Sequence, residues 1–87
     1  MVSQTVTIRN TTGLHLHPAG VFCQTAMQFK SKITFKLDDD EANAKSVLSV
    51  LGACVKAGDE LLLICDGEDE QEALEAMVEV IDSGLGE

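Results

Sequence analysis

The part of the chain best suited to chemistry is a pair of histidines after a glycine turn. His15 and His17 lie in the run Thr12-Gly13-Leu14-His15-Leu16-His17-Pro18-Ala19. Proline fits the first turn of a helix at little cost, because the N–H that it lacks would be unpaired there. The run therefore predicts that a helix begins at Pro18 and that His15 stands just before it.

A histidine at the start of a helix stands beside an anion site. The first N–H groups of a helix have no partner within it, and the helix dipole adds about half a positive charge there. A phosphoryl group on a ring nitrogen of His15 would fall among these donors. The arrangement favours a phosphohistidine, with the imidazole as the nucleophile.

Two other interpretations of the histidines remain open from spacing alone. His15 can be a polar residue at a helix start with His17 as a solvated neighbour, since a lone histidine there is weak evidence for a site. The two can also share a metal ion, because alternate residues of an extended segment point to one side. No third ligand lies nearby in the sequence, so we expect neither a metal nor a cofactor.

Composition limits the partners of this chain. Its 87 residues carry a formal net charge of −9, which would repel phosphate backbones and anionic lipids. We therefore expect no nucleic acid and no membrane as a partner. No signal peptide and no run of 18 apolar residues is visible, which predicts a cytoplasmic protein with a single domain over residues 1–87.

The three cysteines are odd in number, widely spaced and flanked by apolar residues. They are Cys23, Cys54 and Cys65. Such a pattern argues against a disulfide framework, so all three are expected to be buried free thiols.

Hydrophobic periodicity predicts seven elements. Alternating or continuous apolar residues predict strands near residues 2–8, 33–37, 42–44 and 61–65. Apolar residues at three- and four-residue steps predict helices over residues 18–29, from 47 to about 52, and from about 70 to 83. The order βαββαβα favours an α+β fold, an open-faced β-sandwich of a four-stranded antiparallel sheet with three helices on one face.

The histidine segment resembles the active-site motif of HPr, the phosphocarrier of the bacterial phosphoenolpyruvate:sugar phosphotransferase system. That motif reads Gly-Leu/Ile-His-x-Arg-Pro-Ala. The segment Ala44-Lys45-Ser46-Val47-Leu48 resembles the regulatory serine segment of the family, and Gly67-Glu68-Asp69-Glu70 resembles the start of its last helix. The resemblance covers essentially the whole chain, and the predicted order of elements matches the HPr fold.

The resemblance implies a relay rather than a self-sufficient enzyme. His15 would accept a phosphoryl group from phosphorylated Enzyme I and donate it to a sugar-specific IIA domain. The partner surface of the family maps to Leu16, Gly20, Val47, Leu48 and Leu51. Leu48 also lies off the apolar stripe of its helix, which independently predicts that it is exposed.

Ser46 has two predicted roles that are compatible. As an N-cap it would stabilise its helix by about 1 kcal/mol. In HPr proteins of low-GC Gram-positive bacteria, HPr kinase/phosphorylase modifies this serine to slow sugar transport and to recruit a transcriptional corepressor function. The resemblance therefore implies a kinase and a transcriptional regulator as further partners.

Two positions depart from the family pattern. His17 stands where the family has an arginine, a permanent fork-shaped donor, so slower or more pH-dependent transfer is expected. Gly20 stands where alanine is usual, and few basic residues are expected around the site. These departures leave an alternative, a regulatory module of the Crh type that acts through phospho-Ser46 with weak or no relay. The retained His15 favours the relay, because that paralogue type commonly lacks the histidine.

Overall fold

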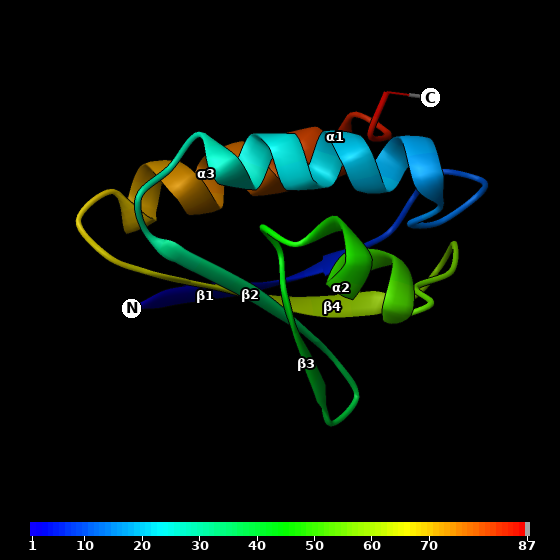
Figure 1. The fold of residues 1–87 in the computed structure, drawn as a ribbon, viewed down its shortest axis with the longest axis horizontal. Coiled ribbons are helices and arrows are strands. Elements are labelled where there is room, and N and C mark those ends of the chain that lie inside the picture. The colour runs from blue at the N-terminus through cyan, green and yellow to red at the C-terminus, as the bar shows by residue number, and fades with distance from the viewer. Residues whose placement is uncertain (87) are drawn as a thin grey trace.

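The computed structural model describes residues 1–86 and shows a four-stranded antiparallel sheet with three helices (Figure 1). The predicted fold class is confirmed. In chain order the elements are β1 (Val2–Thr7), α1 (Leu16–Met27), β2 (Lys32–Leu37), β3 (Asp40–Asn43), α2 (Val47–Gly52), β4 (Glu60–Asp66) and α3 (Glu70–Asp82).

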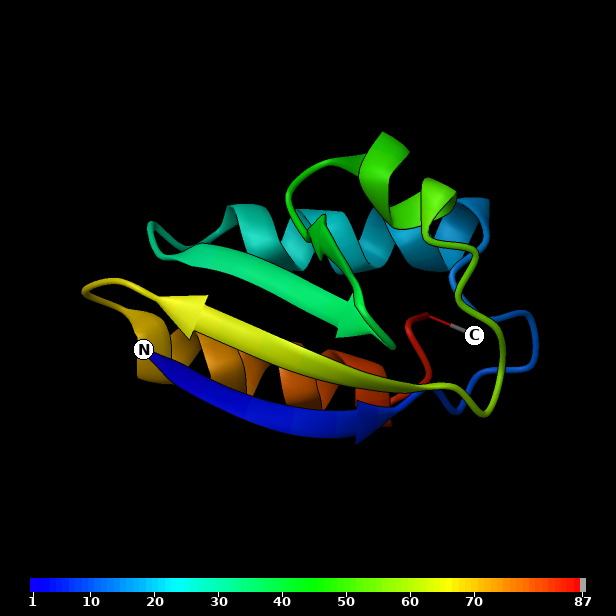
Figure 2. The same cartoon turned by 90° about the horizontal axis from the view of Figure 1, so that it is seen from below.

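The strands lie in the order β1-β4-β2-β3, so the last strand of the chain fills the middle of the sheet. Seen from below, the sheet lies in front of α1 and α3, which run side by side behind it (Figure 2). The short helix α2 packs against α1 and β3. Two of the helices thus cover one face of the sheet, and α2 extends that layer over the β3 edge.

The core fills the space between the sheet and these helices. Leu61, Leu63 and Cys65 of β4 are buried and alternate with partly exposed residues, as expected for a strand with one covered face. The rings of Phe22 in α1 and Phe35 in β2 meet edge to face, with centroids 5.3 Å apart. Aliphatic side chains make up most of the rest, which fits a chain without Trp or Tyr.

The hairpin between β2 and β3 is tighter than its sequence predicted. Leu37 pairs with Asp40, so the turn consists of Asp38 and Asp39 alone, and β3 begins two residues before the predicted Ala42. Asp38 has φ 56°, a left-handed conformation that aspartate tolerates better than most residues.

Helix α1 begins at Leu16 and ends at Met27, two residues earlier at each end than predicted. The N–H of Ala19 donates to the carbonyl of His15 at 2.7 Å. This bond closes the first helical turn, so the helix begins directly after His15. Pro18 is then the third residue of the helix, where its missing N–H still costs little.

The prediction that all three cysteines are buried is wrong for Cys54. Cys23 and Cys65 are buried, whereas Cys54 is exposed. Helix α2 ends at Gly52, and Cys54 has φ 55°, so the chain turns away before the helical spacing can bring this side chain to the core.

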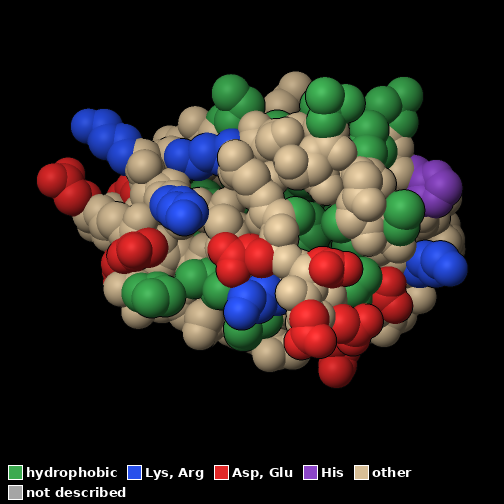
Figure 3. Space-filling view, turned by 60° about the horizontal axis from the view of Figure 1, so that its bottom comes forward, with side chains coloured by type: hydrophobic (Ala, Val, Ile, Leu, Met, Phe, Trp, Pro, Cys, Tyr) green, Lys and Arg blue, Asp and Glu red, His purple; other side chains and the backbone are tan. Residues whose placement is uncertain are grey.

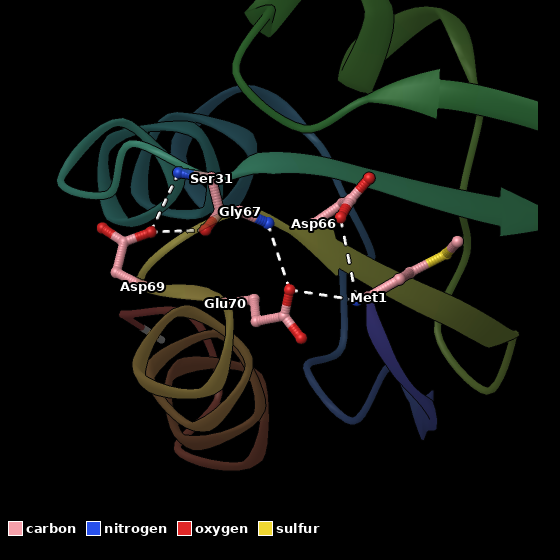
Figure 4. Close-up of polar contacts among 6 residues, drawn as sticks. All are labelled: Met1, Ser31, Asp66, Gly67, Asp69 and Glu70. Atoms are coloured by element: carbon pink, nitrogen blue, oxygen red, sulfur yellow. Dashed lines mark hydrogen bonds and ion pairs between the residues drawn. The ribbon is translucent and has the colours of Figure 1, made fainter.

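The start of α3 is tied to the connection between α1 and β2 (Figure 4). Asp69 does not cap its own helix with its side chain. Its carboxylate instead accepts hydrogen bonds from the N–H of Lys30 at 2.8 Å, the N–H of Ser31 at 2.9 Å and the hydroxyl of Ser31. These bonds, that of the hydroxyl above all, lower the pKa of Asp69 to about 2.

Gly67 allows this close approach. A methyl group built on Gly67 would lie 2.7 Å from the Cα of Ser31, and its φ is 156°. The N–H of Gly67 donates to the carboxylate of Glu70 at 3.2 Å. The amino group of Met1 lies 3.0 Å from that same carboxylate, and its hydrogen bond lowers the pKa of Glu70. β1 is thereby fastened to the start of α3.

No helix within residues 1–86 could cross a membrane, and the longest, α3, has 13 residues.

Candidate functional site

His15 is the N-cap residue of α1, and its side chain is exposed. The side chain makes no capping hydrogen bond, and the backbone at His15 is extended (φ −83°, ψ −173°). The N–H groups of Leu16 and His17 belong to the first turn, where a helix offers them no internal partner. No acidic side chain occupies this turn. The imidazole therefore stands accessible at an unneutralised positive helix end.

A clamp of main-chain contacts holds the loop that presents His15. Gly13 has φ 69°, and a methyl group built on it would lie 2.4 Å from the carbonyl oxygen of Val55. The N–H of Leu14 donates to that same oxygen at 3.0 Å. The side-chain amide of Asn10 donates to the carbonyl of Gly13 at 2.8 Å. Glycine is required at position 13 because any side chain would displace the loop after α2.

The loop after α2 is in turn fixed to the end of β1. The N–H of Gly58 donates to the carbonyl of Ile8 at 2.8 Å, and the N–H of Ile8 donates to the carbonyl of Asp59 at 2.9 Å. The carboxylate of Asp59 accepts from the N–H of Lys56 at 2.8 Å. Two segments that are distant in sequence therefore form one rigid support for the histidine.

A shallow hollow of about 330 Å³ lies beside His15. Its lining residues are Leu14, His15, Leu16, Leu51, Cys54, Val55 and Lys56. Lys56 supplies a cation at this hollow. The sequence did not predict it, because the loop of Lys56 is brought to the histidine by the contacts of Gly13 and Leu14 with the carbonyl of Val55. Lys56 is the one Lys or Arg among the residues that line this hollow.

His17 borders a different hollow, of about 450 Å³, with Leu16, Gly20, Val21 and Gln24. A methyl group built on Gly86 would lie 3.1 Å from Nε2 of His17, so this ring lies against the C-terminal turn. Nothing in the sequence signalled this contact. The structure does not bring His17 into the hollow that His15 borders.

The geometry also contradicts the assumption that His15 and His17 lie on one side of an extended segment, on which a shared metal site depended. The segment is not extended at that point, because α1 begins at Leu16, between them. Across residues 1–86, no three His, Cys, Asp or Glu side chains are gathered as a metal site requires.

Exposed apolar side chains of α1 and α2 form a surface next to the histidine. Leu16 is 75% exposed, Leu48 79% and Val47 38%. The predicted exposure of Leu48 is confirmed. Leu51 and Gly20 are half-buried beside them. We call these five residues the α1–α2 surface. Figure 3 shows hydrophobic side chains along the upper edge of the molecule and histidine at its right-hand side.

Two contacts hold α2 close to α1. The thiol of Cys23 donates to the carbonyl of Lys45 at 3.2 Å, and the ammonium of Lys45 donates to the carbonyl of Phe29 at 2.6 Å. The second bond also satisfies a carbonyl near the end of α1. The α1–α2 surface therefore depends on Lys45 as well as on the apolar packing.

Comparison with known proteins gives the family of this chain. A family model described as "PTS HPr component phosphorylation site" matches residues 2–83. The chain belongs to the HPr family. The HPr-like protein Crh of Bacillus subtilis is 44% identical over 77 residues, which are 88% of this chain and 91% of that protein. Phosphocarrier protein HPr of Neisseria meningitidis serogroup A is 36% identical over 87 residues, covering 100% and 98% of the two chains.

The fold agrees with solved HPr structures. The crystal structure of HPr-C-His from Thermoanaerobacter tengcongensis superposes with a TM-score of 0.97 and 41% identity, covering 100% of this chain and 98% of that one. HPr phosphocarriers and the HPr-like Crh thus both resemble this chain closely. The comparisons therefore establish the fold and the family of this chain.

Ser46, the predicted site of regulatory phosphorylation, is the N-cap residue of α2. Its hydroxyl oxygen accepts a hydrogen bond from the N–H of Ser49 at 3.2 Å. The predicted capping role is confirmed. Ser46 is half-buried and comes directly before the exposed Val47 and Leu48. Phosphorylation of Ser46 stays a prediction.

Proposed function

We propose that this chain is a cytoplasmic phosphocarrier whose His15 accepts a phosphoryl group from phosphorylated Enzyme I and passes it to sugar-specific IIA domains. One observation carries the proposal. The exposed imidazole of His15 stands at the positive end of α1, beside Lys56 and next to the exposed apolar α1–α2 surface.

The transfer needs a nucleophile and a place for the transferred charge. A lone pair on a ring nitrogen of His15 attacks the phosphorus, and the new N–P bond forms as the bond to the donor breaks with its electron pair left on the donor. The N–H groups of Leu16 and His17 and the ammonium of Lys56 attract the resulting dianion. Transfer to the acceptor runs the same exchange in reverse, so the chain ends each cycle unchanged.

The α1–α2 surface is the proposed docking site for both partners. It comprises Leu16, Gly20, Val47, Leu48 and Leu51. Full burial of one leucine side chain is worth about 1.5–3 kcal/mol. The net charge of −9 opposes docking of acidic partners, so apolar contact is the main attraction in this proposal. His17 stands at the rim of this surface, beside Leu16 and Gly20.

Labelling with phosphoenolpyruvate and Enzyme I tests the relay. We expect an acid-labile, base-stable phosphate that His15→Ala abolishes and His17→Ala only reduces. His17→Ala is the matched control, because it removes an exposed imidazole of the same helix start. Equal labelling of His15→Ala and the unaltered chain would overturn the relay. We expect His17→Arg to raise the rate; an unchanged rate would mean that the N–H groups and Lys56 suffice.

A regulatory role of the Crh type is the second candidate. It is favoured by the position of Ser46 at the start of α2, directly before exposed Val47 and Leu48, and by the similarity to Crh. Phosphorylation would add about two negative charges at a helix start that attracts them. HPr kinase/phosphorylase would add the phosphate, and a transcriptional regulator would bind the modified surface.

Treatment with that kinase tests the regulatory role independently of the relay. We expect an acid-stable phosphate that is lost in Ser46→Ala and kept in Ser49→Ala, a serine one turn further along the same helix. A chain that takes up no acid-stable phosphate would not have this role, whatever the result for His15.

A further inference from the structure

A second and larger hollow, of about 630 Å³, lies between β1 and α3. Its lining residues are Gln4 of β1 and Gln71, Leu74, Glu75, Val78, Glu79, Asp82 and Ser83 of α3 and its end. None of them lines the hollow beside His15 or belongs to the α1–α2 surface. We call this feature the β1–α3 groove; Figure 2 shows β1 at the edge of the sheet with α3 behind it.

The floor of the groove is apolar and reachable. Leu74 and Val78 face it from α3. Gln4 is paired in register with the buried Leu63, so it occupies the covered face of the sheet, yet its side chain is exposed. The polar Gln4 thus occupies a position at which a large apolar side chain would fill the space between β1 and α3.

The rim of the groove is acidic. Glu75 and Glu79 are one helical turn apart, a spacing at which like charges destabilise a helix by about 0.2–0.5 kcal/mol. Within residues 1–86 neither forms an ion pair, and Asp82 has only the exposed Arg9, at 3.5 Å. Cations from a partner would relieve this repulsion.

The open edge of β1 is unprotected. Proteins usually block edge strands with charged residues, proline, bulges or short length. The other edge strand, β3, has four residues and includes Asp40 and Glu41. β1 has six residues, Val-Ser-Gln-Thr-Val-Thr, with no charge and no proline. No other strand of the described chain pairs with its outer edge.

We propose that the β1–α3 groove docks an extended, basic segment of another protein. The segment pairs with the outer edge of β1. The side chains that it turns towards α3 alternate between apolar ones, which pack against Leu74 and Val78, and lysines or arginines, which lie near Glu75, Glu79 and Asp82. A second copy of this chain does not fit, because its own β1 offers no cation and each copy has a net charge of −9. This role is separate from transfer through His15.

A synthetic peptide can stand in for the segment. The probe is acetyl-Val-Thr-Lys-Thr-Val-Thr-Lys-amide, whose valines and lysines share one face of the strand, titrated into the ¹⁵N-labelled chain. We expect amide shifts concentrated in β1 and in residues 71–83, with the α1–α2 surface unmoved. Glutamate in place of each lysine should abolish binding, and N-methylation of the amides on one edge of the peptide should abolish it by blocking strand pairing.

Charge reversal in the protein separates a site from general attraction. We expect Glu75→Lys/Glu79→Lys to weaken peptide binding at least about tenfold. The matched control, Glu68→Lys/Glu72→Lys, makes the same change in net charge outside the groove and should alter affinity by less than about threefold. His15 labelling by Enzyme I should proceed at an unchanged rate in both double variants.

Four results would overturn the proposal. They are equal weakening by the two double variants, shifts centred on the α1–α2 surface, no shift up to millimolar peptide, and dimerisation of the peptide-free chain through β1. The relay would survive each of them, because it is tested by labelling of His15 alone.

Discussion

Replacing Gly20 by alanine should stabilise this protein. Gly20 lies inside the 12-residue helix α1, and a methyl group built on it meets nothing within 4 Å apart from its chain neighbours and the backbone of its own helix. Alanine in a helix interior is favoured over glycine by about 0.8–1.0 kcal/mol. With no steric cost to subtract, we expect a gain of about 0.5–1 kcal/mol, mainly because alanine restricts the unfolded chain more than glycine does.

Urea and thermal unfolding followed by circular dichroism would measure this gain. A change of 1 kcal/mol shifts the Tm of a domain this size by about 4–8 °C, so Gly20→Ala should raise it by about 2–8 °C. The urea m-value should stay constant, which would show that stability alone changed.

Gly13→Ala is the control of opposite sign. Its φ of 69° and the 2.4 Å approach to the carbonyl oxygen of Val55 leave no room for a methyl group, so we expect a loss of about 1–3 kcal/mol. A loss or no change in Gly20→Ala would refute the reasoning, since it would mean that the helix is irregular at that position or that the methyl group meets a neighbour.

Three further predictions concern other parts of the fold. The folded pKa of Asp69, about 2, lies below its usual 3.8, so its ionised carboxylate stabilises the fold above about pH 4 and this contribution is lost as the pH falls towards 2. Asp69→Asn should lower the urea midpoint at pH 6 and flatten its fall between pH 4 and 2; an unchanged profile would contradict the role of the carboxylate. Ellman's reagent should titrate one thiol, Cys54, in the folded chain and all three in denaturant; fast reaction of more than one native thiol would contradict the burial of the others. Ser46→Ala should cost about 1 kcal/mol in urea unfolding through loss of the N-cap, and Ser49→Ala, which keeps the accepting hydroxyl, should cost less.

Local periodicity was enough to predict the elements of this fold. The stripe of Leu74, Met77 and Ile81 marks α3, and its members are buried. The apolar run around Leu63 marks β4, the central strand. The turn glycine and the proline placed His15 at a helix start because both constrain the backbone within a few residues.

Contacts between distant segments could not be predicted in this way. In the sequence, Asp69 indicates the start of a helix, yet its carboxylate accepts a hydrogen bond from the N–H of Ser31. Lys56 lies at the hollow of His15 because its loop contacts the main chain at Gly13. Cys54 follows the helical spacing, but a left-handed turn removes it from the core. Each outcome depends on tertiary packing, which local patterns do not encode.

The central position of β4 has a consequence for synthesis of the chain. Both β1 and β2 pair with β4, and Val2 is matched with Cys65, so neither strand can form this pairing until β4 has been made. Pairings this distant in sequence form slowly because a long loop must close first. A nascent chain on the ribosome therefore cannot complete its sheet until β4 has been synthesised, and the loop that presents its histidine has no fixed support before then.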